Sequence, residues 1–354
     1  PSVDAAVMEV ARGGMLRSGL CFRNCEVACC LNVSADHLGS RGIDTLEQLA
    51  EVKRVPIEIA TDAAVLNADD PNCLKMADYT QAEKLCYITM NPSHPLVKQH
   101  INAGGQAFVL EQGMNGHMIA MYESETYTPL LWPLLIPATI EGRAMHNVQN
   151  AMFAAALAYN MNISLEDIRH GLRTFDASFF QAPGRMNIYT EHPFKVILDY
   201  AHNPAAVKAM CGLVDRFEVE GRRIVVLAAP GDRRDEDIRE IAGIAAGHFD
   251  YFICRCDDNR RGRGHDEVAV MLKNRLLEEG VSAESIEVIP DEQEATLRAL
   301  EMSEPGDLVL VLADNVKRSW KQIIYFNSGA HTLSLIHISE PTRPAPLSRM
   351  PSSA

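Results

Sequence analysis

Apolar runs and helical stretches alternate regularly along the C-terminal half of the chain. The apolar runs are rich in β-branched residues and end in polar, turn-forming clusters, which is the pattern of buried strands. The predicted strands cover residues 195–199, 223–229, 250–255, 286–289 and 307–312. Strands that alternate with helices indicate a mostly parallel sheet with right-handed connections. We therefore expect a Rossmann-like α/β domain in this half.

The N-terminal half follows the same α/β pattern with one departure. Strands are predicted at residues 4–10, 27–33, 63–67 and 85–90, and helices at 44–59, 147–159 and 165–175. Between residues 96 and 142, apolar positions alternate and are interrupted by Gly-Gly, Asn-Gly and Glu-Gly, which predicts a β-hairpin insertion. Residues 179–185 are predicted to be a linker, with a hinge near 182–185. We expect two domains, at 1–182 and 183–326.

Composition and charge narrow the class of protein. The 354 residues are 47% hydrophobic and 23% charged, which is ordinary for a globular protein of about two domains. The formal net charge of −14 argues against a general nucleic-acid binder, which is more often basic. No apolar run is long enough for a membrane span, and no signal peptide is visible. We expect a cytoplasmic protein that binds neither nucleic acid nor membrane.

The nine cysteines do not have the spacing of a zinc site. Cys29 and Cys30 are adjacent, and Cys254 and Cys256 are separated by one residue. Most of the cysteines lie in apolar strand patterns, so we expect small core residues in a reducing compartment.

Both ends of the chain look unnatural. It begins without an initiator methionine, and its character changes after Phe326. The stretch L-S-L-I-H-I-S-E-P-T-R-P (residues 333–344) resembles the read-through translation of a transposase sequencing adapter. We therefore interpret residues 327–354 as a non-native tail and expect the chain to be a fragment.

Two similar stretches in the C-terminal half carry the strongest candidate chemistry. Residues 196–204 have the sequence V-I-L-D-Y-A-H-N-P, and residues 224–234 have the sequence I-V-V-L-A-A-P-G-D-R-R. Both fit a strand, a polar loop and the start of a helix, so we predict two neighbouring parallel strands whose loops meet at one sheet edge, where ligands bind in such folds. The side chains expected at this edge are Asp199, His202, Asn203, Asp232, Arg233 and Arg234.

The cluster G-D-R-R-D-E-D at residues 231–237 is the candidate for substrate binding. Arg233 and Arg234 can hold a carboxylate through paired N–H groups. The simpler interpretation is that Gly-Asp makes a turn, that Asn-Pro caps a helix, and that the acidic residues are favoured at a helix N-terminus. The loop R-R-G-R at residues 260–263 either meets an acidic polymer or is solvated.

Glu9 and His37 are candidates for binding a metal ion. Glu9 ends a predicted strand and His37 lies in the loop after the next one, so their side chains can face one cleft. A carboxylate and an imidazole together suit a divalent cation. Lys53 lies on the helix that follows, and its spacing alone predicts an ordinary surface lysine.

Asn147 and Asn150 are three residues apart, which places them on one face of a predicted helix near its N-terminus. Their amides can offer a donor and an acceptor to a purine edge, although Asn147 can instead cap the helix. Arg185 and Asp199 lie on either side of the expected hinge. A guanidinium can bind phosphate and a carboxylate can accept ribose hydroxyls. The alternatives are a linker ion pair and a strand-end cap.

Four motifs follow one another along the chain: N-V-S-A-D-H-L-G (32–39), H-N-V-Q-N-A (146–151), A-P-G-R (182–185) and D-Y-A-H-N-P (199–204). In this order they resemble the Mur ligase family of ATP-dependent, amide-bond-forming ligases. Further stretches at 9–20, 42–53, 66–71 and 228–237 are similar to the branch of the family that builds a polymer of aspartate and arginine. The resemblance covers nearly all of residues 1–326.

The resemblance implies a fold and an activity. It implies a P-loop-type central domain at 1–182, truncated and with a β-hairpin insertion, followed by a Rossmann-like domain at 183–326. It also implies ATP and Mg²⁺, an acyl phosphate on the β-carboxyl of a polymer aspartate, and arginine as the attacking amine. Three alternatives remain: a relative that joins preformed aspartyl-arginine dipeptides, a folate- or peptidoglycan-type ligase, and a non-catalytic nucleotide-binding module.

The phosphate-binding motif G-x-x-x-x-G-K-[ST] is absent from the sequence. We therefore expect this chain to be inactive alone. Its expected partners are ATP, arginine and the polymer, and we expect a homo-oligomer.

The resemblance also implies roles for single residues. In the family the matching Glu and His are magnesium ligands and a matching lysine is carbamylated, which implies these roles for Glu9, His37 and Lys53. The remaining assignments are adenine contact for Asn147 and Asn150, ATP contact for Arg185 and Asp199, catalysis by Lys53, Arg185 and His202, and substrate binding by Asp232, Arg233 and Arg234.

Overall fold

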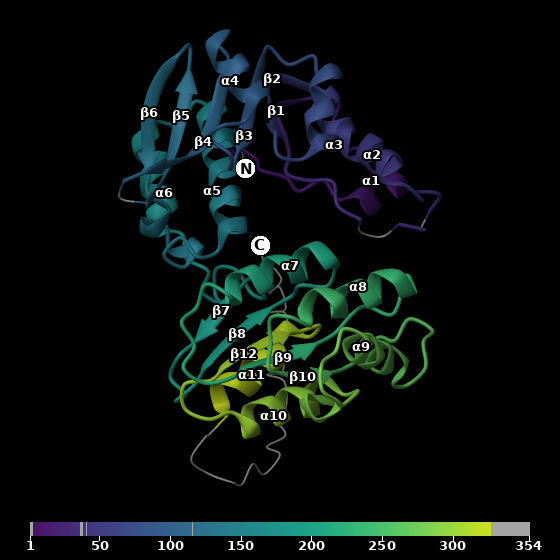
Figure 1. Cartoon of the computed structure of the whole chain (residues 1–354). Coiled ribbons are helices and arrows are strands. Elements are labelled where there is room, and N and C mark those ends of the chain that lie inside the picture. Colours follow the sequence, from purple (N-terminus) through teal and green to yellow (C-terminus); the bar gives the residue numbers. More distant parts are fainter. Residues whose placement is uncertain (1–2, 36–37, 40, 115, 327–354) are drawn as a thin grey trace, which may run out of the picture.

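The computed structural model describes residues 3–35, 38–39, 41–114 and 116–326, and they fold into two lobes (Figure 1). Each lobe is built around a six-stranded sheet with helices packed on it. The strands of the first sheet end at Leu131, and those of the second begin at Asn187. The α/β class expected from the sequence is therefore confirmed.

Six strands form the first sheet in chain order. They are β1 (Cys25–Cys30), β2 (Ala60–Asn67), β3 (Lys84–Thr89), β4 (Gln106–Gly113), β5 (Gly116–Glu123) and β6 (Thr126–Leu131). The first four are parallel, and β5 and β6 are antiparallel to their neighbours. Val65 in β2 and Ile88 in β3 are fully buried, as expected for strands that are covered on both faces.

Helices cover both faces of the first sheet. They are α1 (Arg12–Ser18), α2 (Leu46–Glu58), α3 (Pro71–Leu74), α4 (Pro95–Asn102), α5 (Met145–Asn160) and α6 (Leu165–Thr174). One apolar core packs α5 against the sheet and includes Phe108 and Met152. The other core packs α2 and α3 against the opposite face and includes Leu49 and Leu66. The three helices predicted in this lobe, α2, α5 and α6, are confirmed.

One expectation for the first lobe is wrong. Residues 4–10 form no strand, and Val7 is 84% exposed. The apolar pattern of this segment fits a strand, but a strand also needs a hydrogen-bonding neighbour, and no described strand pairs with it. The β-hairpin predicted within residues 96–142 is confirmed, because β5 pairs antiparallel with both β4 and β6, and β4 joins this ribbon to β3 of the main sheet. The first part of that region forms α4.

The second sheet has the strand order β11-β10-β9-β12-β8-β7. Its strands are β7 (Asn187–Tyr189), β8 (Lys195–Asp199), β9 (Arg223–Leu227), β10 (Tyr251–Cys254), β11 (Ile286–Val288) and β12 (Leu308–Leu312). Only the edge strand β7, which the sequence did not predict, is antiparallel to its neighbour. The expectation that β8 and β9 are neighbours is wrong, because the fully buried β12 lies between them.

Helices also cover both faces of the second sheet (Figure 1). They are α7 (Pro204–Val214), α8 (Asp235–Ala245), α9 (Glu267–Glu278), α10 (Glu292–Met302) and α11 (Val316–Tyr325). The core under α7, α8 and α9 includes Met210, Ile241 and Leu272. The core under α10 and α11 includes Ala295 and Ile323. The five strands predicted here are all present, with ends that differ by at most two residues.

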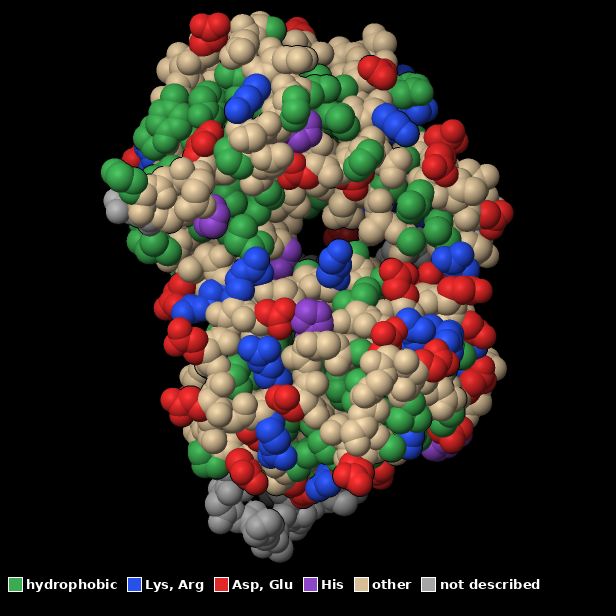
Figure 2. Space-filling view, in the orientation of Figure 1, with side chains coloured by type: hydrophobic (Ala, Val, Ile, Leu, Met, Phe, Trp, Pro, Cys, Tyr) green, Lys and Arg blue, Asp and Glu red, His purple; other side chains and the backbone are tan. Residues whose placement is uncertain are grey.

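The two lobes touch just before and at the start of α5. Ala144 is buried in the core of the second lobe, and Ile140 packs against the same core. The guanidinium of Arg143 lies over the ring of Phe217, 5.7 Å from its centroid. Ile140 has a φ of 53°, which is unfavourable for a β-branched residue and places this turn under strain. Elsewhere the surface between the lobes is hollowed (Figure 2).

Candidate functional site

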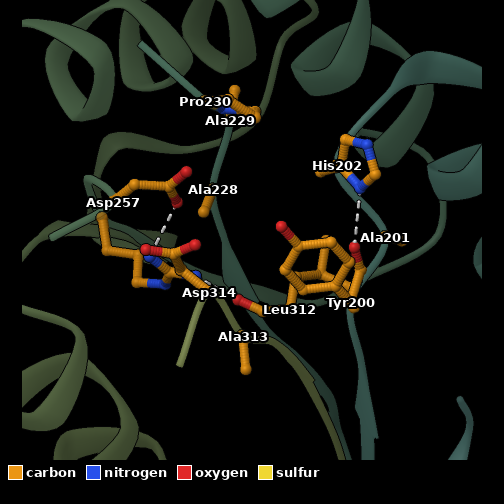
Figure 3. A pocket seen from close by; sticks show the side chains of 11 residues that line it. Tyr200, Ala201, His202, Ala228, Ala229, Pro230, Asp257, Leu312, Ala313 and Asp314 are labelled. Carbon is orange, nitrogen blue, oxygen red and sulfur yellow. Dashed lines mark hydrogen bonds and ion pairs between the residues drawn. The ribbon is translucent and has the colours of Figure 1, made fainter. Parts of the chain in front are cut away.

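Loops after four parallel strands of the second sheet meet around one pocket (Figure 3). The strands are β8, β9, β10 and β12, whose carboxyl ends lie at the same sheet edge. Its polar lining comes from Tyr200, His202, Arg255, Asp257 and Asp314, and residues 228–230 add small apolar side chains. We call this the sheet-edge pocket. The prediction that the loops after β8 and β9 meet at one edge is confirmed.

A buried ion pair lies beside the sheet-edge pocket. Arg255 follows β10 and is 1% exposed, and its Nη2 lies 3.0 Å from Oε2 of Glu292, which is fully buried. The same guanidinium donates to the carbonyl oxygen of Leu312 at 2.6 Å and pairs with Asp257 at 3.1 Å. Within the described ranges, Nε of Arg255 is buried without a partner. One side chain therefore links the loops after β10 and β12.

The sheet-edge pocket holds more carboxylates than cations. Asp257 and Asp314 line it, and Glu292 lies on the other side of Arg255. Burial raises the pKa of Asp257 against the opposing effect of the Arg255 guanidinium, and Asp314 and Glu292 raise it further. A cation in the pocket would relieve this accumulation of negative charge. The charge of the pocket therefore favours an ammonium or guanidinium group over a carboxylate.

Asp199, at the end of β8, holds the linker. One carboxylate oxygen accepts a hydrogen bond from the backbone N–H of Met186 at 2.8 Å, and the other accepts one from Ala201 at 2.7 Å. Burial raises the pKa of Asp199, while these two N–H groups and Arg185 act in the opposite direction. Arg185 itself is exposed, and its guanidinium has no hydrogen bond or ion pair within the described part of the chain.

His202 and Asn203 have different roles in the loop after β8. Nδ1 of His202 lies 3.0 Å from the carbonyl oxygen of Tyr200, and the two rings are 5.0 Å apart beside the pocket (Figure 3). Asn203 accepts a hydrogen bond from the N–H of Ala206 at 2.9 Å and caps α7, which begins at Pro204. The capping interpretation of Asn-Pro is thus confirmed, and His202 is the side chain of this pair that faces the pocket.

Internal ion pairs occupy the polar cluster at residues 231–237. Arg234 donates from Nε and Nη2 to the two oxygens of Asp237 at 3.0 and 2.7 Å. Asp232 pairs with Arg233 at 3.2 Å and also with Arg261. The fork of Arg234 therefore binds a carboxylate of its own helix, and the side chain of Arg233 is buried. Substrate binding by Asp232, Arg233 and Arg234 stays a prediction.

The loop R-R-G-R packs against this cluster. Arg263 donates to the carbonyl oxygen of Gly231 at 3.1 Å and to that of Arg233 at 2.9 Å. A β-carbon on Gly231 would lie 2.2 Å from the carbonyl oxygen of Arg260, so the two loops are in close backbone contact. Arg260 itself is exposed. The loops after β9 and β10 therefore form one unit at the sheet edge.

Two side chains at and just after the carboxyl end of β2 hold the loop that follows β1 in the first lobe. Nδ2 of Asn67 donates to the carbonyl oxygen of Leu31 at 2.6 Å. Asp70 accepts a hydrogen bond from the N–H of Val33 at 2.7 Å and also caps α3. Both residues belong to the stretch L-N-A-D-D-P. The carboxyl ends of β1 and β2 are therefore tied together at the edge where a P-loop-type domain binds its ligand.

The structure describes only one of the two predicted metal ligands. His37 lies outside the described residues, and Glu9 is exposed in the extended segment before α1. Within the described ranges, no group of three or more His, Cys, Asp or Glu side chains is arranged to hold a metal ion. Lys53 lies on α2, as predicted, and its Nζ donates to the carbonyl oxygen of Asn32 at 2.9 Å. The roles of Glu9, His37 and Lys53 stay predictions.

Asn147 and Asn150 contact each other on α5, as their spacing predicted, because Nδ2 of Asn150 donates to Oδ1 of Asn147 at 3.0 Å. Asn147 donates to the carbonyl oxygen of Ala138 at 2.7 Å. The N-cap of α5 is Ala144, so the interpretation of Asn147 as the cap is wrong. Asn150 is exposed and its amide oxygen is available to a ligand. Burial lowers the pKa of the adjacent His146 to about 4.

Two family models together match most of the chain. Residues 1–158 match the Mur ligase middle domain, and residues 184–315 match the Mur ligase glutamate ligase domain. The chain belongs to the Mur ligase family. The resemblance carried by the four motifs is therefore confirmed. The sheet-edge pocket lies in the second Mur ligase domain, whose matched range contains all of its lining residues.

The Mur ligase relatives include cyanophycin synthetases. The chain is 41% identical to that of Synechocystis sp. over 321 residues, which is 90% of this chain and 36% of that protein. It is 42% identical to that of Trichormus variabilis over 325 residues, which is 91% of this chain and 35% of that protein. The chain thus spans about a third of the length of these curated relatives.

A solved structure shares the fold. It is the bifunctional folylpolyglutamate synthase/dihydrofolate synthase of Yersinia pestis, complexed with AMPPNP and Mn ion. The two align with a TM-score of 0.58 and 20% identity, over 84% of this chain and 61% of that chain. The Mur ligase fold class is therefore confirmed. As for membranes, none of the helices in the described ranges combines the length and apolarity that a bilayer crossing requires.

The sequence reasoning missed Arg255, Glu292 and Asp314 of this Mur ligase. Arg255 was detectable as a charged residue directly after the apolar run Y-F-I-C. Glu292 resembles any acidic residue at a helix N-terminus, where the dipole favours a carboxylate without burial. No signal in the sequence separates it from Glu294, two positions further on, although the structure buries Glu292 completely.

Proposed function

We propose that this chain is the amide-forming part of an ATP-dependent ligase that adds arginine to a polymer of aspartate and arginine. The observation that carries the proposal is the carboxylate-rich sheet-edge pocket in a chain about 41% identical to cyanophycin synthetases. Asp257 and Asp314 give this pocket the charge that a guanidinium or ammonium group needs. The fold places the pocket at the carboxyl ends of parallel strands, where α/β domains bind ligands.

The proposed reaction has two steps. First, a β-carboxylate oxygen of a polymer aspartate attacks the γ-phosphorus of ATP, the bond from that phosphorus to the β,γ-bridging oxygen breaks, and an acyl phosphate and ADP form. Then the α-amino nitrogen of arginine attacks the acyl carbon and loses a proton, the carbon–oxygen bond to phosphate breaks, and the amide and inorganic phosphate form. The protein contributes chiefly by positioning the reactants and neutralising charge.

Polar groups near the sheet edges of both lobes support the proposed contacts with ATP. Asn150 has an available amide oxygen for adenine, and Asn147 orients it. Arg185 is exposed and unpaired within the described residues, so its guanidinium can reach phosphate. Asp199 already accepts two backbone N–H groups, but each carboxylate oxygen keeps a lone pair for a ribose hydroxyl.

The proposed cation is Mg²⁺, held by Glu9 and His37. The carboxylate of Glu9 is exposed, which fits a ligand to a metal that also contacts phosphate. The cation would neutralise charge on the phosphates. The Nζ of Lys53 donates to a backbone carbonyl, and this fits an unmodified lysine, so carbamylation of Lys53 needs a direct test by mass spectrometry.

The proposed catalytic and substrate-binding roles are divided between the sheet-edge pocket and the cluster at residues 231–237. His202 faces the pocket and is proposed to take part in catalysis there. Asp232, Arg233 and Arg234 are proposed to meet the polymer end. Their internal pairs would then have to open, since Arg234 already binds Asp237 through both oxygens. We further propose a cytoplasmic homo-oligomer whose domains are residues 1–182 and 183–326.

The activity of the whole protein is best tested in the full-length product of its gene, since the chain alone is proposed to be inactive. The assay would supply ATP, Mg²⁺, a primer that contains polyaspartate, and radiolabelled arginine, and follow label into insoluble polymer. Incorporation that is lost in Glu9→Ala and Asp199→Ala variants is the expected result. A conservative surface change, Glu284→Ala on the exposed turn before β11, serves as the control.

Other outcomes assign the chain differently. Growth with aspartyl-arginine dipeptide but not with free arginine would move the function to the dipeptide-polymerising relative. ATP binding without ligation of either substrate would favour a nucleotide-binding module. ATP turnover by the 354-residue chain itself would contradict the proposed need for further sequence.

A further inference from the structure

One buried carboxylate holds the segment between β12 and α11. Glu292 is the first residue of α10 and is 0% exposed. Its Oε2 accepts a hydrogen bond from the N–H of Asp314 at 2.8 Å. Its Oε1 accepts one from the N–H of Asn315 at 3.1 Å and another from the hydroxyl of Ser319 at 2.6 Å. The backbone that carries Asp314 to the sheet-edge pocket is therefore fastened to α10.

The partner of Glu292 fastens a second loop. Arg255 pairs with Glu292 at 3.0 Å and also with Asp257, the other pocket carboxylate, at 3.1 Å. It further donates to the carbonyl oxygens of Cys256 at 2.9 Å and Leu312 at 2.6 Å. The Arg255–Glu292 pair is therefore bonded both to the loop that carries Asp257 and to the loop that carries Asp314.

A second guanidinium repeats the same link from α11. Arg318 donates to both oxygens of Asp258 at 2.7 and 3.0 Å, and its Nη2 lies 3.4 Å from Oε1 of Glu292. Asp258 directly follows Asp257 in the loop after β10. Two arginines from different elements therefore converge on Glu292 and reach the same loop.

Stability alone does not account for this arrangement. Removing two charges from water is costly, and a well-packed apolar pair of similar volume is often equally stable. Glu292 and Arg255 are nonetheless almost completely buried. Buried ionic groups can instead fix one geometry among several, because they are satisfied only when every partner is in place.

We propose that the Arg255–Glu292 ion pair is the positioning device of the sheet-edge pocket. It sets the separation of Asp257 and Asp314, and so selects a cationic amine substrate. The substrate named here rests on the proposed function. The positioning of the two loops does not depend on the proposed function, so the positioning role and the proposed function can be disproved separately.

The kinetic test uses the full-length product of the gene with Glu292→Gln and with the double variant Arg255→Met/Glu292→Gln. The double variant removes the buried pair as a unit and leaves without this partner only Asp257, which lines the pocket, so it is expected to fold even where Glu292→Gln does not. We expect KM for arginine to rise about tenfold to a hundredfold, as for a misplaced binding group, while KM for ATP changes less than about twofold.

A matched pair on the other side of α10 supplies the control. Arg298 and Glu287 form an ion pair at 2.7 Å that joins α10 to β11, and neither residue lines the pocket. The double variant Arg298→Met/Glu287→Gln should therefore leave KM for arginine within about twofold of the wild type. Equal effects of the two double variants on that KM would overturn the proposal.

Hydrogen exchange on the 354-residue chain tests the positioning without any assay of activity. The amides of Asp314 and Asn315 should exchange faster in both Glu292 variants, and should be unchanged in the control variant. Unchanged exchange would overturn the proposal, as would faster exchange with an unchanged KM for arginine. If the wild type ligates no amine, the proposed function is wrong. The exchange rates alone then decide whether the ion pair positions the two loops.

Discussion

The carboxylate of Asp199 accepts a hydrogen bond from the backbone N–H of Met186 at 2.8 Å, which fastens the linker to the end of β8. The carbonyl oxygen of Gly184 accepts a second bond, from the N–H of Tyr200 at 2.9 Å. Gly184 has a φ of 73°, and a β-carbon there would lie 2.7 Å from Cγ2 of Val316. Residues 184–186 are therefore part of the second lobe, and Arg185 moves with it.

The same attachment extends upstream along the linker. Nδ2 of Asn187 donates to the carbonyl oxygens of Ala177 at 2.8 Å and Ala182 at 3.0 Å. The ring of Phe179 stacks on Trp320 of α11, with centroids 5.0 Å apart. These contacts hold the linker from Ala177 onward on the second lobe, and the hinge expected at residues 182–185 stays a prediction.

Asp199→Asn should destabilise the second lobe by about 1–3 kcal/mol, because an amide turns one of the two acceptor oxygens into a donor facing an N–H group. Urea unfolding followed by tryptophan fluorescence measures the change. Asp250→Asn is the control, since Asp250 also accepts a strand N–H, from Arg223 at 2.8 Å, but is exposed. Equal losses in the two variants would contradict the role given to Asp199.

Phe179→Ala should lower the free energy of unfolding by about 1–2 kcal/mol, because it removes a stacked aromatic contact between the linker and α11. Its neighbour Phe180 is 96% exposed and provides a matched control. Phe180→Ala should change stability by less than about 0.5 kcal/mol. If both variants unfold at the same urea concentration as the wild type, the linker is not held through Phe179.

Gly231→Ala should impair ligation by the full-length protein. The added β-carbon would lie 2.2 Å from the carbonyl oxygen of Arg260, so the loops after β9 and β10 must move apart. KM for arginine is expected to rise about tenfold, as for a displaced binding loop. Gly264→Ala, in the loop after β10, meets only an ordinary contact, 3.5 Å from Glu267, and should behave like the wild type.

Asp70→Ala should cost about 2–3 kcal/mol of folding free energy, because it removes both the cap of α3 and the bond to the N–H of Val33. Asp291 caps α10 but holds no second loop, so Asp291→Ala should cost about 1 kcal/mol. Urea unfolding gives both values. Hydrogen exchange at Val33 should accelerate only in Asp70→Ala, and its acceleration in both variants would refute the tether.

His146 should make folding stability depend on pH. Burial lowers its pKa to about 4 in the folded chain, below the value near 6.5 of an unfolded histidine. Between these pH values the unfolded chain binds the proton more tightly than the folded chain. The free energy of unfolding is therefore highest above about pH 6.5 and falls as the pH decreases toward 4. The loss approaches about 3 kcal/mol at pH 4.

Urea unfolding between pH 4 and pH 7 measures this dependence in the wild type and in His146→Gln. The variant should lose the contribution of His146, so its stability should fall less steeply with acid. His265→Gln, at an exposed position, should retain the slope of the wild type. Parallel profiles for the wild type and His146→Gln would show that His146 is not the group responsible.

Local sequence determined the elements of this protein and part of its site. The apolar runs of β8, β9, β10 and β12 and the periodicity of α2, α5 and α6 are expressed over a few neighbouring residues, so each could be located without the fold. The Asn203 cap and the contact between Asn147 and Asn150 also follow from spacing within one helix. The motifs of the Mur ligase family are also short stretches of neighbouring residues, so they can be recognised in the sequence.

Only the tertiary structure decided which elements and charges are partners. An apolar run shows that a strand is buried but not which strand it pairs with, so β12 between β8 and β9 could not be foreseen. The same limit applies to residues 4–10, whose apolar pattern does not lead to a strand. Arg255 reaches Glu292 across 37 positions of sequence, because burial forces each charge onto the counter-charge that the fold brings nearest.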